Sequence, residues 1–361
     1  MEFEPNCATT AMGIMPHKDL DRALALALGL DVAFWPQLPN TSFLEDMYAQ
    51  ASAHFPGIAI DSQHHVITFD TRRFQEELPT YSEISGEPQT YALTAEESPA
   101  YHRFLGHDLA GYPAIRGQII GPISFGFRVV DENRRPVIYD DDVRPLLFDF
   151  LQNKLNQQYR ELRTKNAHAF VWLDEPGLGW IFSAMSGYVD TTAREDYTTF
   201  LAGCEGPRAL HLCADINLPF LLSLGLDIVS FDAFQIGQLP REYAAVAAGF
   251  LKQGGVISWG IVPTDSTNLG EATLDSVRER LLFGWQRIAE QGVLLERIAR
   301  QSMLAPARCC LKNIGRVGAA GEEGGIACAA TEGSPIEERL VGTAFRLVGD
   351  LSLRLREEFH L

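Results

Sequence analysis

The stretch from residue 227 to residue 261, DIVSFDAFQIGQLPREYAAVAAGFLKQGGVISWGI, contains two short apolar runs separated by a segment of helical length. The runs at 227–233 and 255–261 are rich in β-branched and aromatic residues, which favours strands, whereas residues 240–252 between them are rich in Ala and favour a helix. Two strands joined through a helix lie parallel in one sheet. This unit therefore predicts a parallel sheet with crossover helices.

The same alternation continues outward from this unit in both directions. Six further apolar runs occur at residues 10–15, 32–35, 118–120, 169–173, 209–213 and 303–309. Helix-forming segments lie at 19–28, 146–165, 191–202, 273–291 and 336–359, and Asp19 is the expected N-cap of the first. Eight strands that alternate with helices predict an α/β fold, a (β/α)8 TIM barrel, as a single domain over residues 1–361.

A barrel of this kind needs about 250 residues, so the chain has room for insertions. The largest is expected at residues 40–115, between the second and third strands, and it includes alternating pieces at 57–60 and 66–69. Residues 125–140, where apolar runs at 125–130 and 136–139 flank a polar turn, predict a hairpin arm after the third strand. Residues 315–335 are rich in Gly and Ala without a period, which indicates a flexible loop before the last helix.

The composition excludes several classes of protein. Thirty Lys and Arg against 47 Asp and Glu give a net charge of −17, which repels phosphate backbones and anionic lipids, so neither nucleic acid nor a membrane is an expected partner. No apolar run reaches the roughly 20 residues that cross a bilayer. The first residues, MEFEP, are acidic where a signal peptide is basic, so the expected location is the cytoplasm. Six irregularly spaced Cys are too few for a disulfide framework.

The fifth strand run ends in His211-Leu212-Cys213. Side chains two residues apart on a strand point to the same side, so His211 and Cys213 are expected to face one centre. That centre lies at the C-terminal mouth of the barrel, where reactive groups gather. Imidazole and thiolate are ligands that zinc prefers, at about 2.0–2.3 Å. The pair therefore predicts a zinc site, although a buried His or Cys also occurs in ordinary cores.

A third soft ligand comes from the eighth run, which ends in Cys309-Cys310. Adjacent residues of a strand face opposite sides, so one of these two cysteines faces the barrel axis. With His211 and Cys213 it makes a three-ligand site that has an open fourth position, the pattern of catalytic zinc. Asp232, at the end of the sixth run, is expected beside the site as a fourth ligand or as the partner of a ligand.

An open zinc site of this composition suits the activation of a thiol. A free thiol has a pKa of about 8.5 and is mostly protonated near neutrality. A thiol that is coordinated to zinc is deprotonated and keeps its nucleophilicity. The donor set therefore favours alkylation of sulfur.

Several stretches spread over nearly the whole chain match a known family. They read MGIMPH (12–17), FWPQLP (34–39), RGQ (116–118), GP (121–122), LDEP (173–176), HLC (211–213), SFD (230–232), WGIVPT (259–264) and CCL (309–311). They resemble the barrel domain of cobalamin-independent methionine synthase and its short relatives in the uroporphyrinogen decarboxylase-like superfamily. The resemblance implies a zinc-dependent methyltransferase of methionine biosynthesis that acts on a small thiol such as homocysteine. It also implies that Cys309 is the ligand, because Cys310 falls where the family carries Gly.

The match is incomplete at several positions. Ile14 stands where the family commonly has a Ser that contacts substrate, Asp232 where the synthases have a Glu ligand, and Val262 where they have a catalytic His. Arg308 is an extra residue before Cys309. A chain of 361 residues also leaves no room for the second barrel that helps to hold folate in the synthases. The expected methyl donor is therefore a methylcorrinoid, presented by a corrinoid protein as partner.

Further site residues are expected at other strand ends. The resemblance implies that Asp174 binds a substrate ammonium and that Glu175 orients it, although both acids could instead simply begin the next loop. Asp174 and His17 are the expected catalytic residues. His17 follows the first strand, where it reaches the substrate or donates to an acid, or else caps the helix that starts after Asp19. Ile14 is expected to contact substrate, and aromatic side chains such as Trp259 are expected to keep water from the methyl group.

Two other functions fit the same barrel. One is a metal-free decarboxylase like uroporphyrinogen decarboxylase, which needs cationic side chains at the mouth, whereas residues 16–18, PHK, offer no Arg cluster. The other is a non-catalytic barrel that binds a metal or a thiol. Ile14 and the absence of His at position 262 leave this second alternative open, and turnover assays separate it from an enzyme.

Overall fold

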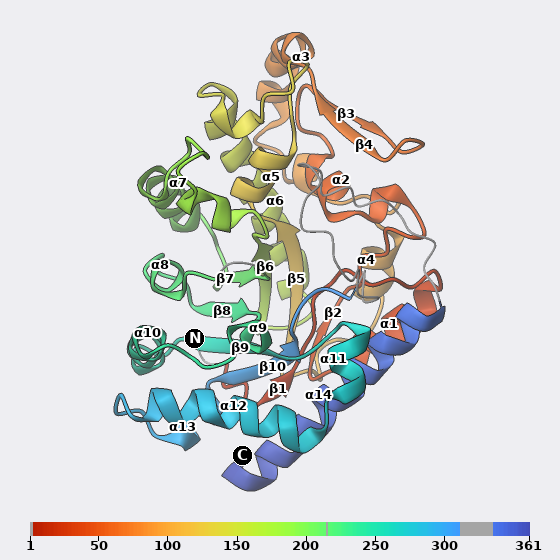
Figure 1. The fold of residues 1–361 in the computed structure, drawn as a ribbon. Helices are drawn as coiled ribbons and strands as arrows, with labels where there is room; N and C mark the ends of the chain where they lie inside the picture. Colours follow the sequence, from red (N-terminus) through yellow and green to blue (C-terminus); the bar gives the residue numbers. More distant parts are fainter. Residues whose placement is uncertain (1–2, 214–215, 311–334) are drawn as a thin grey trace.

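The computed structural model describes residues 3–213, 216–310 and 335–361. Its centre is an eight-stranded parallel sheet that curls into a barrel, with helices around the outside (Figure 1). The barrel strands are β1 Ala8–Thr9, β2 Val32–Phe34, β5 Ala114–Ile120, β6 Ala169–Asp174, β7 Arg208–Leu212, β8 Ile228–Phe231, β9 Val256–Val262 and β10 Ser302–Pro306. The predicted (β/α)8 fold is confirmed.

The strand order shows how the sheet closes. The order is β1-β10-β9-β8-β7-β6-β5-β2, so β1 and β2 are the two edges. Just beyond their ends, Ile14 and Gln37 form an isolated parallel bridge. The Met15 N–H donates to the Gln37 carbonyl at 3.0 Å, and the Gln37 N–H donates to the Gly13 carbonyl at 2.8 Å. These bonds join the two edges at the C-terminal mouth.

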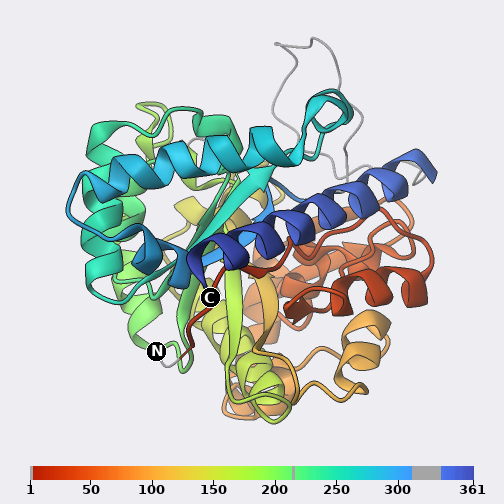
Figure 2. The same cartoon turned by 90° about the horizontal axis from the view of Figure 1, so that it is seen from below.

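Helices follow the strands as the sequence predicts, with short additional helices between them. The α-helices are α1 Leu20–Leu28, α2 Met47–Ser52, α3 Thr71–Ile84, α4 Pro99–Leu105, α5 Pro122–Arg128, α6 Val143–Arg163, α7 Asp190–Ala202, α8 Leu218–Leu222, α9 Ala233–Ile236, α10 Arg241–Lys252, α11 Ser266–Glu271, α12 Leu274–Ala289, α13 Leu295–Arg300 and α14 Pro335–Phe359. Asp19 caps α1 by accepting from the Arg22 N–H, as predicted. Figure 2 shows α14 beside α1, and an Arg22–Glu338 ion pair of 2.9 Å links the two helices.

The segment between β2 and β5 includes the projection at the top of Figure 1, where α3, β3 and β4 lie. It contains the antiparallel hairpin of β3 Ile58–Asp61 and β4 Val66–Phe69, where the sequence predicts alternating pieces. It also contains α2, α3, α4 and the 3-10 helices η1 Phe43–Glu45 and η2 Pro88–Tyr91. Phe55, Phe69 and Phe74 pack together at its centre, with ring centroids 5.4 to 6.4 Å apart.

The prediction of a hairpin arm at residues 125–140 is wrong. The segment contains most of α5 and the 3-10 helix η3 Val137–Tyr139, and its two halves pair only through the single bridge Val130–Pro136. Pro122 at the first turn favours a helix start, and the Glu175 carboxylate accepts from the first free N–H groups of α5. That carboxylate is about 50 residues away in the sequence, so local patterning does not reveal it. The predicted loop at 315–335 falls almost wholly outside the described residues, and Cys328 lies there too.

The core has an inner and an outer part. Inside the barrel, apolar side chains from all eight strands form one cluster, which includes Ala8, Ala114, Phe170, Trp172 and Met303. A larger cluster lies between the barrel and its helices, and a third lies under α1 and α14. Of the described helices, none is both long and apolar enough to span a membrane.

Candidate active site

Polar side chains occupy the inward positions of four neighbouring strands near the barrel mouth. In the strand register, Asp174 of β6 pairs with His211 of β7, His211 with Ser230 of β8, and Ser230 with Ser258 of β9. All four are buried. Asp174 Oδ1, His211 Nε2 and Ser258 Oγ have no hydrogen-bond partner among the described residues. Buried polar atoms in native proteins nearly always have partners, so this row indicates a binding site.

His211 is held in a fixed orientation by two neighbours. Its Nδ1 lies 3.0 Å from Ser230 Oγ, and its ring stacks on Trp172 with centroids 6.1 Å apart. Burial lowers the pKa of His211 to about 3, and the positive charge of Arg116 contributes to the decrease. The imidazole is therefore neutral at physiological pH. Its unpartnered Nε2 is a nitrogen of the kind that binds metals.

The structure brings two of the predicted thiols close enough to interact. Cys213 directly follows β7, and Cys309 lies three residues beyond β10. Burial raises the pKa of the Cys213 thiol to about 12, and the charges of Cys309 and Asp174 add to the increase. The two cysteines and Asp174 therefore share one region at the C-terminal end of the barrel.

Cys309 and Cys310 contact different parts of the core. Cys309 packs against the cluster inside the barrel, whereas Cys310 is buried in the cluster under α1 and α14. Burial also raises the pKa of Cys310. The Cys310 N–H donates to the Ile14 carbonyl at 3.3 Å, which ties this segment to the seam of the barrel. Of the two adjacent thiols, Cys309 is the one on the side of His211 and Cys213.

The donor set has the chemistry of a zinc site, although its side chains are not gathered around one point. Within the part of the chain that the structure describes, no three His, Cys, Asp or Glu side chains are placed to hold one metal ion. One imidazole nitrogen without a partner and two interacting thiols at strand ends nevertheless match the ligands of catalytic zinc. His211, Cys213 and Cys309 are the residues that would hold the ion.

Asp232 already has partners for both carboxylate oxygens. Oδ1 accepts from the Gln235 N–H at 2.8 Å, which caps α9, and Oδ2 accepts from Arg308 Nε at 2.7 Å. Arg308, the extra residue relative to the synthases, is thus an ion-pair partner of Asp232. The carboxylate is buried, and its ion-pair partner Arg308 also interacts electrostatically with Cys213 and Cys309. As it stands, Asp232 positions Arg308 rather than a metal.

Asp174 and Glu175 are adjacent but have different environments. Burial raises the pKa of Asp174 to about 7, Arg116 opposes this increase, and Glu175 adds to it. Glu175 accepts from the N–H groups of Ile123 and Ser124 at 3.1 and 2.7 Å, and from the hydroxyls of Ser124 and Tyr197. Glu175 therefore caps α5 with both oxygens. This differs from the predicted role in orienting substrate, because a carboxylate with four donors has no oxygen left for a ligand.

Three other predicted site residues lie away from the row of unpartnered atoms. Trp259 is on the outer face of β9, where it packs against Phe231 and Trp285 and donates to Ser302 Oγ at 2.9 Å, so the prediction that it lines the mouth needs correction. His17 is fully buried, and neither ring nitrogen has a described partner. Burial lowers its pKa, and the charges that act on it belong to α1, its N-cap Asp19 and α14. Ile14 lies at the barrel seam.

Sequence reasoning missed Arg116 as a site residue. This fully buried Arg lies on β5, and its guanidinium carbon lies 4.7 Å from the ring centre of Phe34 and 4.2 Å from that of Trp172. Arg116 Nη2 has no partner among the described residues. The available signal was a single cation within the otherwise uncharged strand run AIRGQII.

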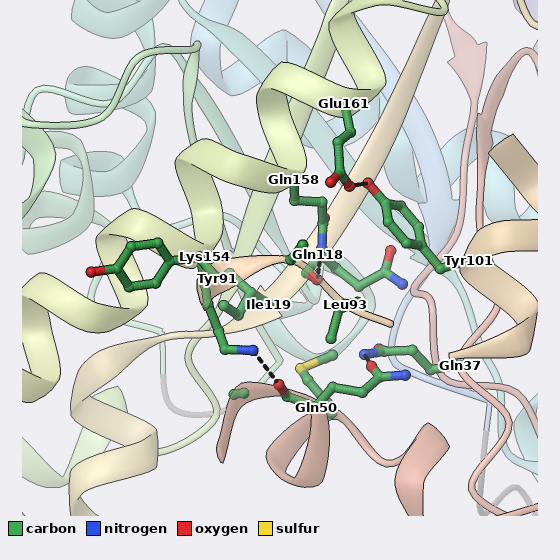
Figure 3. Close-up of a pocket in the computed structure, with 13 residues that line it drawn as sticks. Gln37, Gln50, Tyr91, Leu93, Tyr101, Gln118, Ile119, Lys154, Gln158 and Glu161 are labelled. Atoms are coloured by element: carbon green, nitrogen blue, oxygen red, sulfur yellow. Dashed lines mark hydrogen bonds between the residues drawn. The ribbon is translucent and has the colours of Figure 1, made fainter. Parts of the chain in front are cut away.

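A separate small cavity lies outside the barrel, between the β2–β5 insertion and α6 (Figure 3). Its volume is about 20 Å³, which has room for about one water molecule. Figure 3 shows Lys154 directed at the Gln50 carbonyl, which accepts from Nζ at 3.0 Å, and Tyr101 directed at Glu161, whose carboxylate accepts at 2.7 Å. These hydrogen bonds hold the insertion against α6. Gln118 also lines the cavity and accepts from Arg116 Nη1, so the cavity adjoins the candidate active site.

Comparisons with known proteins support the fold. No protein-family model matches the chain, and no curated protein matches it. Among solved structures, a methyltransferase from Methanosarcina mazei is similar, with a TM-score of 0.50 and 16% sequence identity. The similarity covers 100% of this chain and 95% of that one. At this identity the likeness shows a shared barrel fold.

Proposed function

We propose that this protein is a methyltransferase that moves a methyl group to a small thiol, with a zinc ion held by His211, Cys213 and Cys309. The observation that carries the proposal is the unpartnered, buried Nε2 of His211, which lies two residues before Cys213, a thiol that interacts electrostatically with Cys309. The similar structure from Methanosarcina mazei is a methyltransferase, which supports methyl transfer as the reaction class.

When bound, zinc would hold the acceptor sulfur as a nucleophilic thiolate near neutral pH. The chain supplies the remaining requirements. Burial keeps His211 neutral, and Ser230 fixes its ring so that Nε2 is available. Asp174, which has one unpartnered oxygen, would bind an ammonium group of the acceptor. The apolar cluster inside the barrel would help to keep water from the reacting sulfur.

The proposed donor is a methylcorrinoid, carried by a corrinoid protein. A departing folate nitrogen needs a proton, and the residue at the end of β9 is Val262, which cannot supply one. Cobalt(I) leaves without a proton. In the transfer, the acceptor sulfur forms the new bond to the methyl carbon, the cobalt–carbon bond breaks, and its electron pair stays on cobalt.

The test is thiol-dependent demethylation of methylcobalamin, which is monitored through the change in the absorption spectrum of the cobalamin. With zinc-loaded protein, homocysteine should be methylated from methylcobalamin or from a methylated corrinoid protein, whereas methyltetrahydrofolate should give no product. Methylation from the folate would contradict the donor. No demethylation with any small thiol would contradict the methyltransferase and favour a barrel that only binds a thiol or a metal.

A further inference from the structure

We propose that Arg116 binds the carboxylate of the acceptor thiol and so determines which thiols this site accepts. The inference rests on the proposed function and assigns a binding role to one further residue of that same site. Nothing in the family resemblance assigns a role to this position. The contacts of the guanidinium and the groups around it point to this role.

Most of the Arg116 side chain is fixed by its neighbours. The guanidinium lies between the rings of Phe34 and Trp172. Nε donates to Thr10 Oγ1 at 3.2 Å, and Nη1 donates to Gln118 Oε1 at 2.9 Å. A fixed guanidinium loses little freedom when it binds a further group, so the site is organised before the ligand arrives.

The remaining nitrogen of this guanidinium has no acceptor. Nη2 is buried and unpartnered among the described residues, and the neighbouring indole N–H of Trp172 is also buried and unpartnered. Arg normally satisfies its donors in pairs with a carboxylate or phosphate. A buried cation that lacks such a partner in the protein is expected to receive it from a ligand.

The charge pattern around Arg116 fits an amino-acid thiol. The carboxyl group that acts on Arg116 electrostatically is Asp174, and no ion pair between the two is formed in the described structure. Asp174 Oδ1 is itself unpartnered. A buried cation and a buried acid that both have unpartnered atoms, on the adjacent strands β5 and β6, match the carboxylate and the ammonium of one zwitterion. The Trp172 ring joins Arg116 to His211, because the guanidinium carbon lies 4.2 Å from its centre and the His211 ring stacks on it with centroids 6.1 Å apart.

The experiment compares L-homocysteine with L-homocysteine amide, in which a neutral amide replaces the carboxylate. Binding of each to the full-length, zinc-loaded protein is measured by calorimetry. The wild type should prefer the carboxylate by about 10- to 100-fold, because a charge-assisted bidentate pair is replaced by a weaker contact. Arg116→Met should bind the two compounds within about threefold of each other, and Arg116→Lys should keep part of the preference.

The matched control is Arg208→Met. Arg208 is a half-exposed residue at the start of β7, at the opposite end of the barrel, where it pairs with Asp227 at 3.4 Å. This variant should keep the wild-type preference. If Arg116→Met does not fold, Arg116→Lys still decides the question, because a purely structural Arg would leave the preference of the Lys variant unchanged.

The outcomes separate this inference from the proposed function. The role of Arg116 would be overturned if the wild type bound both compounds equally or bound neither. It would also be overturned if an Arg116 variant kept the full preference for the carboxylate. Carboxylate preference without demethylation of methylcobalamin would support Arg116 and contradict the methyltransferase. Demethylation without any carboxylate preference would support the methyltransferase and contradict Arg116.

Discussion

Replacing Cys213 with Ala is expected to lower the zinc content from about one ion per chain to almost none, because a three-ligand site that loses a thiolate cannot hold the metal. Cys309→Ser should have the same effect, since Cys309 packs against the interior of the barrel. The check is elemental analysis of protein purified without chelators.

Cys310→Ser is the matched control for this experiment. Cys310 adjoins Cys309 in sequence but lies in the cluster under α1 and α14, so this variant should keep most of the metal. Loss of metal from Cys310→Ser with retention in Cys309→Ser would mean that the ligand has been assigned to the wrong side of this segment. Zinc that survives Cys213→Ala at the wild-type level would refute the site.

Replacing Glu175 with Gln is expected to destabilise the protein by about 2–4 kcal/mol. The NH2 group of the buried amide would face N–H and O–H donors whose hydrogen bonds the carboxylate accepts in the wild type. Glu175 accepts from two N–H groups at the start of α5 and from the hydroxyls of Ser124 and Tyr197. The substitution leaves at least one of these donors without an acceptor. Urea denaturation followed by circular dichroism measures the loss.

Tyr197→Phe provides the control for Glu175. It removes one donor and leaves Glu175 with three, so it should cost about 1 kcal/mol. A Glu175→Gln protein that is as stable as the wild type would mean that the carboxylate does not cap α5. It would also reopen the possibility that Glu175 contacts substrate.

The barrel could be predicted from the sequence because its strands and helices have distinct local patterns. The unit of β8, α10 and β9 shows this most clearly, since apolar runs flank a segment with a helical composition. The hairpin arm could not be corrected from local patterns. Residues 122–128 form α5 because Glu175, distant in sequence, accepts from its first N–H groups.

Which face of a strand a candidate residue occupies could be predicted only in part. Alternation predicts that His211 points inward, and the register places it opposite Asp174 of the neighbouring strand. Trp259 was assigned to the mouth because an aromatic residue looks alike on either face of a strand, and packing against Trp285 places it outside. β10 ends at Pro306, so strict alternation does not extend to Cys309.

Arg116 illustrates the limit of sequence reasoning at this site. A single Arg within an apolar strand run could as well be an exposed residue of an edge strand. The binding role of Arg116 is inferred from the structure, in which the side chain is completely buried and two aromatic rings flank the guanidinium. One of its nitrogens has no acceptor among the described residues. None of these is encoded within a few residues of position 116.

The measurement that tests the central claim most directly is zinc X-ray absorption of the purified protein with and without homocysteine. Two cysteine sulfurs at about 2.3 Å are expected for the protein alone, and a third sulfur should appear when the thiol is added, because the acceptor takes the open position. A sulfur count that does not change on addition of the thiol, or a protein that contains no zinc, would contradict the account.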